Sequence, residues 1–101
     1  MAQLETCKDM AADERGLVHG GFAFGLADYA AMLAVNDPHV VLGGAETRFL
    51  APVTVGDVMT AEAQVLEQSG KKRLVRCEVR TDRKVLEGTF TCFVLPQHVL
   101  D

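Results

Sequence analysis

The spacing of hydrophobic residues changes near residue 36 and divides the chain into a helical part and a strand part. From Phe22 to Val35 the residues are apolar apart from Asp28 and the phenol of Tyr29. A helix that is apolar on all sides is normally buried, because a surface helix keeps one polar side. The run is also shorter than the ~20 residues of a membrane span. The pattern predicts a helix enclosed by its own protein, with one carboxylate inside.

Turn residues end this helix, and alternating patterns follow it. Asn36, Asp37 and Pro38 form a stop signal, since Asn and Asp favour turns and the residue before a proline avoids the α region. Alternation of apolar and polar residues then predicts strands, with turns at residues 69–72 and 81–84. The expected strands are residues 40–50, 58–68, 73–81 and 85–95, and residues 2–8 add a short edge strand.

The predicted order is therefore a short strand, one buried helix and four strands in an antiparallel meander. A helix this apolar requires a curved sheet wrapped round it, with a second subunit over the remaining side. This α+β arrangement, with about five antiparallel strands round one central helix, is the hot-dog fold. Residues 1–101 are expected to form a single hot-dog domain, near the low end of the usual domain size.

Charge and cysteine content narrow the function classes. The net charge of −4 argues against nucleic acid as a partner, because phosphate binding requires a basic surface. Cys7, Cys77 and Cys92 are far apart and odd in number, so they support neither a zinc site nor a disulfide framework, and we interpret them as packing residues. Residues 1–10 lack the apolar core of a signal peptide. We expect a cytoplasmic protein with no metal site and no membrane partner.

Two blocks of residues carry a family resemblance. His19-Gly20-Gly21, followed by Phe24 and by Leu26-Ala27-Asp28, is similar to the HGGxxFxLAD signature of hot-dog acyl-CoA thioesterases of the PaaI-like type, in the 4-hydroxybenzoyl-CoA thioesterase superfamily. Residues 49–52 (Phe-Leu-Ala-Pro) and then Gly56-Asp57 resemble the FLxP…GD segment of the same family. The resemblance implies hydrolysis of an acyl-CoA thioester, with no cofactor besides the coenzyme A of the substrate. It also implies a homodimer that assembles to a tetramer.

The first block contains the groups that thioester hydrolysis requires. Free N–H groups at a helix N-terminus stabilise an oxyanion, and glycine at positions 20 and 21 lets a thioester approach the backbone. Asp28 is the candidate general base or nucleophile, since apolar neighbours make its carboxylate more basic. His19 completes the candidate catalytic set, in a positioning role at the helix entry.

The separation of these groups points to a dimer. Gly20 and Asp28 are eight residues apart, which corresponds to about 12 Å along a helix. One thioester carbon cannot easily contact both groups of one chain. Two helices that run antiparallel across a twofold axis would bring Gly20 of one chain near Asp28 of the other, and the family is known for sites shared in this way.

Three further residues are candidates for positioning water or substrate. Family members often carry an asparagine six residues before the histidine, where this chain has Asp13, and an ionised carboxylate there would repel an oxyanion. Many members also carry a serine or threonine on the strand after the helix, and the candidates here are Glu46 and Thr47. Glu46 alternates with Arg48 and Leu50, so that it either faces the site or pairs with Arg48.

Two other functions stay open at this point. A non-catalytic acyl-CoA binding or sensing module would use the same groove without a competent acid, and Asp13 in place of asparagine favours it. A hot-dog hydratase is less favoured, because it needs a histidine after the acid and residues 29–35 contain none.

The sequence does not identify the acyl group of the substrate. The tunnel that selects it is expected to involve Phe22, Phe24, Tyr29 and Met32. Most basic residues of the strands and turns are expected to be solvated, although a few could hold the phosphates of coenzyme A. These basic residues are Lys71, Lys72, Arg73, Arg76, Arg80 and Arg83.

Overall fold

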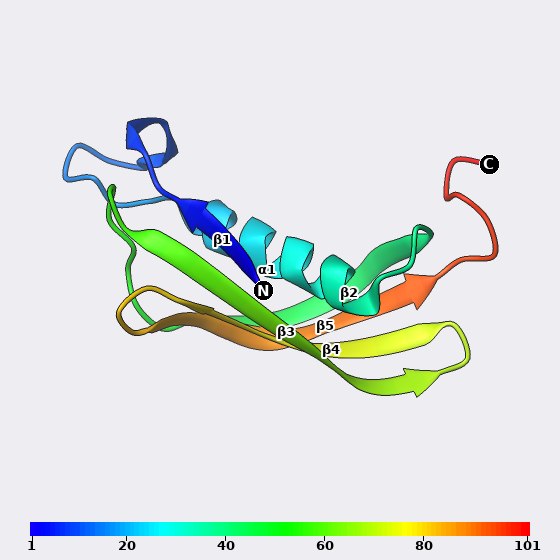
Figure 1. Ribbon diagram of the computed structural model, residues 1–101. Coiled ribbons are helices and arrows are strands. Elements are labelled where there is room, and N and C mark those ends of the chain that lie inside the picture. Colours follow the sequence, from blue (N-terminus) through cyan, green and yellow to red (C-terminus); the bar gives the residue numbers. More distant parts are fainter.

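The computed structural model describes residues 1–101 and places one α-helix across one face of a five-stranded antiparallel sheet (Figure 1). A 3-10 helix, Lys8–Met10, lies between the first strand and the α-helix. The main elements are β1 (Ala2–Glu5), α1 (Gly20–Val35), β2 (Val40–Phe49), β3 (Val58–Ser69), β4 (Lys72–Arg80) and β5 (Lys84–Val94). The predicted α+β class, with one long helix and five strands, is confirmed.

The strand order corrects one part of the prediction. The order in the sheet is β1-β3-β4-β5-β2, so that β2 pairs with β5 at the far edge and not with β3, which follows it in the chain. The expected four-strand meander is therefore wrong for β2. Residues 50–57 are not a hairpin, because they pair with the segment before the helix: Val18 N–H donates to Val53 O at 2.7 Å, and Val55 N–H donates to Gly16 O at 2.8 Å.

Local signals set both ends of α1. His19 is the N-cap, with extended backbone angles, and its side chain accepts a hydrogen bond from Gly21 N–H. Asn36 is the C-cap in the left-handed region (φ 55°), and its N–H donates to Met32 O. Asn tolerates this conformation better than most residues, and Pro38 cannot continue the helix. The predicted helix end near Val35 is confirmed.

Small helix residues and larger sheet residues form the core. The four alanines that α1 turns toward the sheet allow its backbone to approach closely, and the Cys77 thiol donates to Ala27 O at 3.6 Å. The buried alanines are Ala23, Ala27, Ala30 and Ala31. The sheet supplies larger side chains that are fully buried, among them Met59, Val75, Val79, Leu86 and Phe90. The predicted inward faces of β3, β4 and β5 are therefore confirmed.

The cysteines do not all behave as expected. Cys77 and Cys92 are buried in the core, whereas Cys7 is exposed. Assigning Cys7 to packing is wrong, because β1 ends at Glu5 and the chain leaves the sheet into the 3-10 helix.

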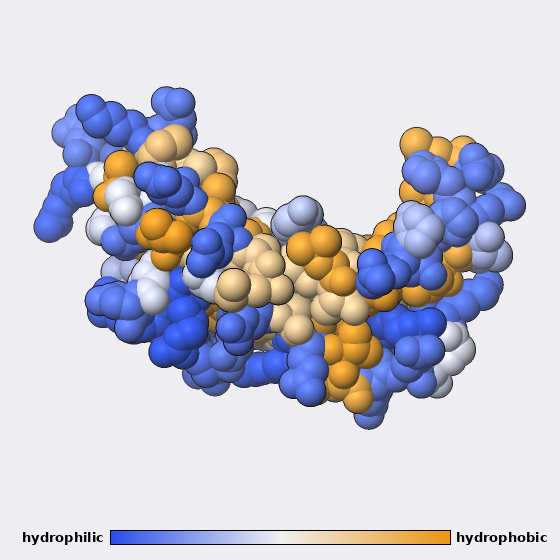
Figure 2. Space-filling view, viewed as in Figure 1, coloured by the Kyte–Doolittle hydropathy of each residue, from blue (hydrophilic) through white to orange (hydrophobic).

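One side of α1 stays open in the single chain. Phe22, Tyr29 and Leu33 are 37%, 57% and 48% exposed and lie on the side away from the sheet. Figure 2 shows hydrophobic side chains gathered in the centre of this face, in a hollow between the N-terminal segment and the C-terminal tail. The sheet therefore covers the helix on one side only. No helix in the structure combines the length and hydrophobicity needed to cross a bilayer.

Candidate active site

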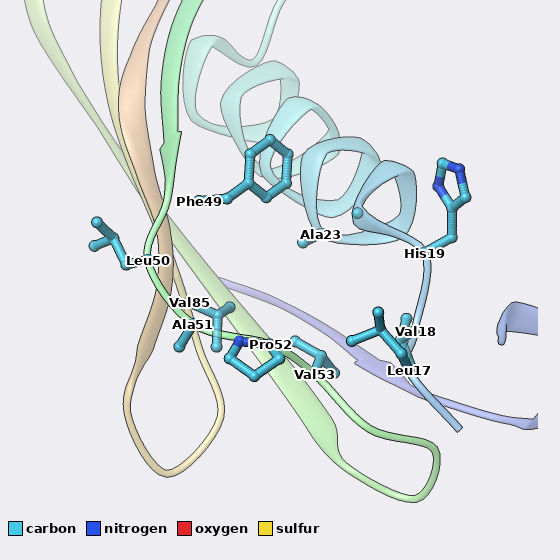
Figure 3. A pocket seen from close by; sticks show the side chains of 11 residues that line it. Leu17, Val18, His19, Ala23, Phe49, Leu50, Ala51, Pro52, Val53 and Val85 are labelled. Atoms are coloured by element: carbon cyan, nitrogen blue, oxygen red, sulfur yellow. The ribbon is translucent and has the colours of Figure 1, made fainter. Parts of the chain in front are cut away.

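A cavity of about 420 Å³ opens at the N-terminus of α1 (Figure 3). It lies between the helix start, the end of β2 and the beginning of β5, and most of its lining is apolar. Its walls are residues 17–20 and 49–53, with Ala23 and Val85. The two sequence blocks that carry the family resemblance therefore meet at one place, although 20 residues (29–48) separate them.

The hydrogen bonds at the helix start distinguish the two glycines. Gly21 N–H donates to His19 Nδ1 at 2.9 Å, so that it is already satisfied within the chain. Gly20 N–H makes no hydrogen bond in the structure and lies at the cavity. An uncapped N–H at a helix N-terminus is a donor for a carbonyl oxygen or an oxyanion. Gly20 is therefore the donor that the geometry leaves free.

His19 is placed as a capping residue. Because its Nδ1 accepts from Gly21 N–H, the neutral ring carries its proton on Nε2. The ring is exposed and points outward from the helix start, away from Phe49 (Figure 3). The positioning role expected for His19 agrees with this geometry.

The Asp28 carboxyl lies two turns further along α1 and is partly buried. Its Oδ1 is buried and has no hydrogen-bond partner, the one buried side-chain oxygen or nitrogen in this condition. Burial raises the pKa of this carboxyl above its ordinary value. Burial, followed by the charges of Cys92 and Asp28, raises the pKa of Cys77 to about 12. The carboxyl is therefore a partly desolvated base close to the buried thiols of β4 and β5.

A single chain does not bring the two candidate groups together. Gly20 lies at the cavity, whereas Asp28 is not among the residues that line it. The helical rise places them about 12 Å apart along the axis, more than a single reacting carbon can span.

A bulge in β2 decides which of Glu46 and Thr47 faces the helix. Leu42 pairs with Cys92 and Ala45 with Phe90, both on the helix side, so that one extra residue lies between them. Thr47 therefore shares the helix side with Gly88, and Glu46 is on the outer face opposite Thr89. Strict alternation from Leu42 would have reversed these positions. Thr47 is half-buried.

Asp13 organises the loop before the helix. Its Oδ1 accepts hydrogen bonds from Arg15 N–H and Leu17 N–H, both at 3.0 Å, and the side chain is exposed. These bonds shape the turn that leads into the cavity wall at Leu17. The structure gives Asp13 a local structural role, with its carboxylate already engaged.

The aromatic and basic candidates lie elsewhere. None of the four expected tunnel residues lines the cavity, and the Phe24 ring packs against Phe90 with centroids 5.4 Å apart. Of the basic candidates, Arg76 forms ion pairs with Glu78 and Glu87 on the outer face of the sheet, where Lys84 pairs with the same two carboxylates. Sequence reasoning missed Phe49 as a cavity residue, although it begins the Phe-Leu-Ala-Pro block. The Phe-Leu-Ala-Pro block was the sequence signal that could have identified Phe49. Its contact with Gly20 joins residues that are distant in the sequence, so no local pattern revealed it.

The family model described as "Thioesterase superfamily" matches residues 15–87. The chain belongs to this superfamily. The matched range contains both sequence blocks and the whole of α1, and the five-stranded sheet with one helix is the hot-dog fold. Membership supports thioester hydrolysis as the general class of reaction.

Two solved structures show how closely the fold is shared. An uncharacterized protein, PH1136 from Pyrococcus horikoshii, is 60% identical with a TM-score of 0.96 over 98% of this chain and 77% of that chain. A hypothetical thioesterase from Streptococcus pneumoniae, solved with coenzyme A, is 21% identical with a TM-score of 0.82 over 95% of this chain and 77% of that chain. At 21% identity, the similarity to the Streptococcus pneumoniae protein supports the shared fold alone.

Two curated relatives are longer proteins with different names. A methylthioribose-1-phosphate isomerase from Aquifex aeolicus is 53% identical over 94 residues, which are 91% of this chain and 21% of that protein. A transcription factor FapR from Caldanaerobacter subterraneus is 28% identical over 97 residues, 95% of this chain and 48% of that protein. The chain thus spans about a fifth and about half of the length of these relatives.

Removal of the helix cap gives a first prediction. His19→Ala leaves Gly21 N–H without a partner, and the loss of a side-chain cap costs about 0.5–2 kcal/mol of stability. His19→Asn keeps an acceptor at the same position and should retain most of this stability. Urea unfolding of the three proteins measures the difference. If alanine and asparagine destabilise equally, the hydrogen bond to Gly21 contributes nothing to stability.

The raised pKa of Asp28 gives a second prediction. The folded state binds this proton more tightly than the unfolded state, whose carboxyl titrates near 3.8. Ionisation of Asp28 therefore lowers the free energy of unfolding. This loss develops as the pH rises through the raised pKa that Asp28 has in the folded state. Asp28→Asn should raise the free energy of unfolding at pH 7, and the gain should shrink toward pH 4. Urea unfolding across this range at one protein concentration tests it, and a pH-independent gain would contradict the assignment.

Proposed function

We propose that this protein hydrolyses acyl-CoA thioesters in a homodimer. Gly20 N–H of one protomer polarises the thioester carbonyl, and Asp28 of the partner protomer acts as general base or nucleophile. The observation that carries this proposal is the buried Asp28 oxygen, which has no hydrogen-bond partner within its own chain. A partly desolvated carboxyl whose pKa is raised by burial is typical of a catalytic base.

The proposed reaction uses only groups of this chain and water. As general base, Asp28 takes a proton from water while the water oxygen attacks the thioester carbon. Gly20 N–H donates to the developing oxyanion, which a preorganised backbone donor stabilises strongly in a site that excludes water. Collapse of the tetrahedral intermediate breaks the carbon–sulfur bond, and the proton held by Asp28 passes to the departing sulfur. The products are the free acid and the coenzyme A thiol, and Asp28 is again a carboxylate.

The dimer in this proposal rests on two properties of the single chain. The helix exposes apolar side chains at Phe22 and Leu33, and β2 is an edge strand with one unpaired side. An unpaired strand edge and an exposed apolar patch are both surfaces that a second copy can cover. Assembly beyond the dimer, to a tetramer, is a further part of the proposal.

A second candidate function is a non-catalytic acyl-CoA binding module. It is favoured by the relative named transcription factor FapR, which matches 95% of this chain. The two candidates separate in one experiment with the wild-type protein and a panel of short, long and aromatic CoA esters. Thiol release supports the thioesterase, whereas thermal stabilisation by an ester without thiol release selects the binding module.

A further inference from the structure

Phe49 lies directly against the helix start. A Cβ atom on Gly20 would be 3.1 Å from Phe49 Cε1 and 3.5 Å from its Cζ. The Phe49 ring therefore borders the Gly20 backbone, and Figure 3 shows it reaching from β2 toward α1. The thioester carbonyl that the proposed function places at Gly20 N–H therefore lies beside this ring.

The backbone under the ring is fixed, but the ring itself is not enclosed. Phe49 pairs with Leu86, and Leu50 N–H donates to Val85 O at 2.8 Å. The side chain is nevertheless 58% exposed, which is unusual for phenylalanine. Only rotation or removal of the side chain can therefore widen the approach to Gly20. The three heavy atoms nearest to a Cβ at position 20 all belong to the Phe49 ring.

The chemistry of the cavity indicates which part of an acyl-CoA it holds. No Lys, Arg, Asp or Glu lines it, and His19 is its one titratable residue. Coenzyme A phosphates need cations and its amides need hydrogen-bond partners, neither of which an apolar wall supplies. A hydrocarbon acyl group has no such requirement. The acyl group is therefore the part that fits this cavity.

We propose that Phe49 is a specificity-determining residue that admits straight-chain acyl groups and restricts groups that are bulky next to the carbonyl. An α-branched or aromatic acyl group places its extra carbon atoms where the Phe49 ring meets Gly20. A straight chain passes the ring edge and enters the cavity. This inference rests on the proposed function, in which the thioester carbonyl lies at Gly20 N–H.

The test compares hexanoyl-CoA with benzoyl-CoA in wild type, Phe49→Leu and Phe49→Ala. The ratio of kcat/KM, benzoyl over hexanoyl, should rise at least about tenfold in Phe49→Ala, and less in Phe49→Leu, as expected when a steric contact of a few carbon atoms is removed. Phe93→Ala is the matched control, because this half-buried ring lies on the outer face of the same sheet. Its ratio should equal that of wild type.

A binding readout keeps this test separate from the proposed function. Ketone analogues of hexanoyl-CoA and benzoyl-CoA carry a methylene in place of the thioester sulfur. Their affinities for the same variants are measured by calorimetry. A wild type that binds the analogues but releases no thiol would refute the hydrolysis, and the affinity ratio then decides the role of Phe49. An unchanged ratio in both readouts, or no binding of either analogue, overturns the inference.

Discussion

Asp28→Asn is expected to lower kcat for thiol release from acyl-CoA by at least about 10²-fold, and up to about 10⁴-fold, the usual contribution of a general base. The amide keeps the size of the side chain but accepts no proton at neutral pH. Because the replaced carboxyl is partly desolvated, the variant should fold at least as well as wild type. A loss of activity therefore cannot be attributed to a loss of structure.

The control for this variant removes a carboxylate of the same charge from the surface. Glu67→Gln serves, since Glu67 is exposed near the end of β3 and is not among the residues that line the cavity. Its turnover should match that of wild type, whereas Asp28→Ala should be as inactive as Asp28→Asn. Undiminished thiol release in either Asp28 variant would refute the assignment.

The acid limb of the pH profile gives an independent check on the same group. A base acts only when it is ionised, and burial raises the pKa of Asp28. We expect kcat/KM to fall on the acid side at a pH above the ~3.9 of an exposed aspartate. This limb should disappear in the residual activity of Asp28→Asn. An acid limb that persists unchanged would assign the titration to another group.

The parts of the fold that depend on residues close together in the sequence were predictable from the sequence pattern. Alternation along β3, β4 and β5 identified their inward faces, and Asn36 with Pro38 marked the end of α1 correctly. The place of β2 was not predictable in this way. Its pairing with β5 joins residues that are 37 (Phe49 with Leu86) to 54 (Val40 with Val94) positions apart, and no local pattern encodes which edge of the sheet a strand will occupy.

In the candidate site, too, the positions of individual residues depend on long-range pairing that the sequence pattern does not reveal. The choice between Glu46 and Thr47 depended on one bulge residue, Gly43, where a Cβ atom would overlap the Phe93 ring. Only the pairing register fixes the position of the bulge, and hence which face of the sheet every later residue of β2 occupies. Likewise, the hydrogen bond from Gly21 N–H to His19 Nδ1 leaves one free donor where the sequence suggested two.

The free donor can be removed with little change in the helix. Gly20 is the first helical residue, where proline is well tolerated, and His19 has the extended angles (φ −60°, ψ 132°) that suit a residue before proline. Gly20→Pro should therefore keep the helix and lose the N–H. Loss of one oxyanion donor costs about 10²–10³-fold in kcat. Gly20→Ala is the matched control, because it adds a carbon atom next to Phe49 but retains the N–H.

Combining this variant with Asp28→Asn tests whether the active site is shared between subunits. In a twofold dimer that pairs Gly20 of one chain with Asp28 of the other, a heterodimer of G20P and D28N chains contains one intact site and one doubly altered site. Heterodimers purified by two different tags should regain roughly half of the wild-type activity, although each parent homodimer is nearly inactive. Heterodimers of two differently tagged D28N chains are the control and should stay inactive. If each chain instead contained a complete site, every site in the mixed dimer would carry a lesion, and no activity would return.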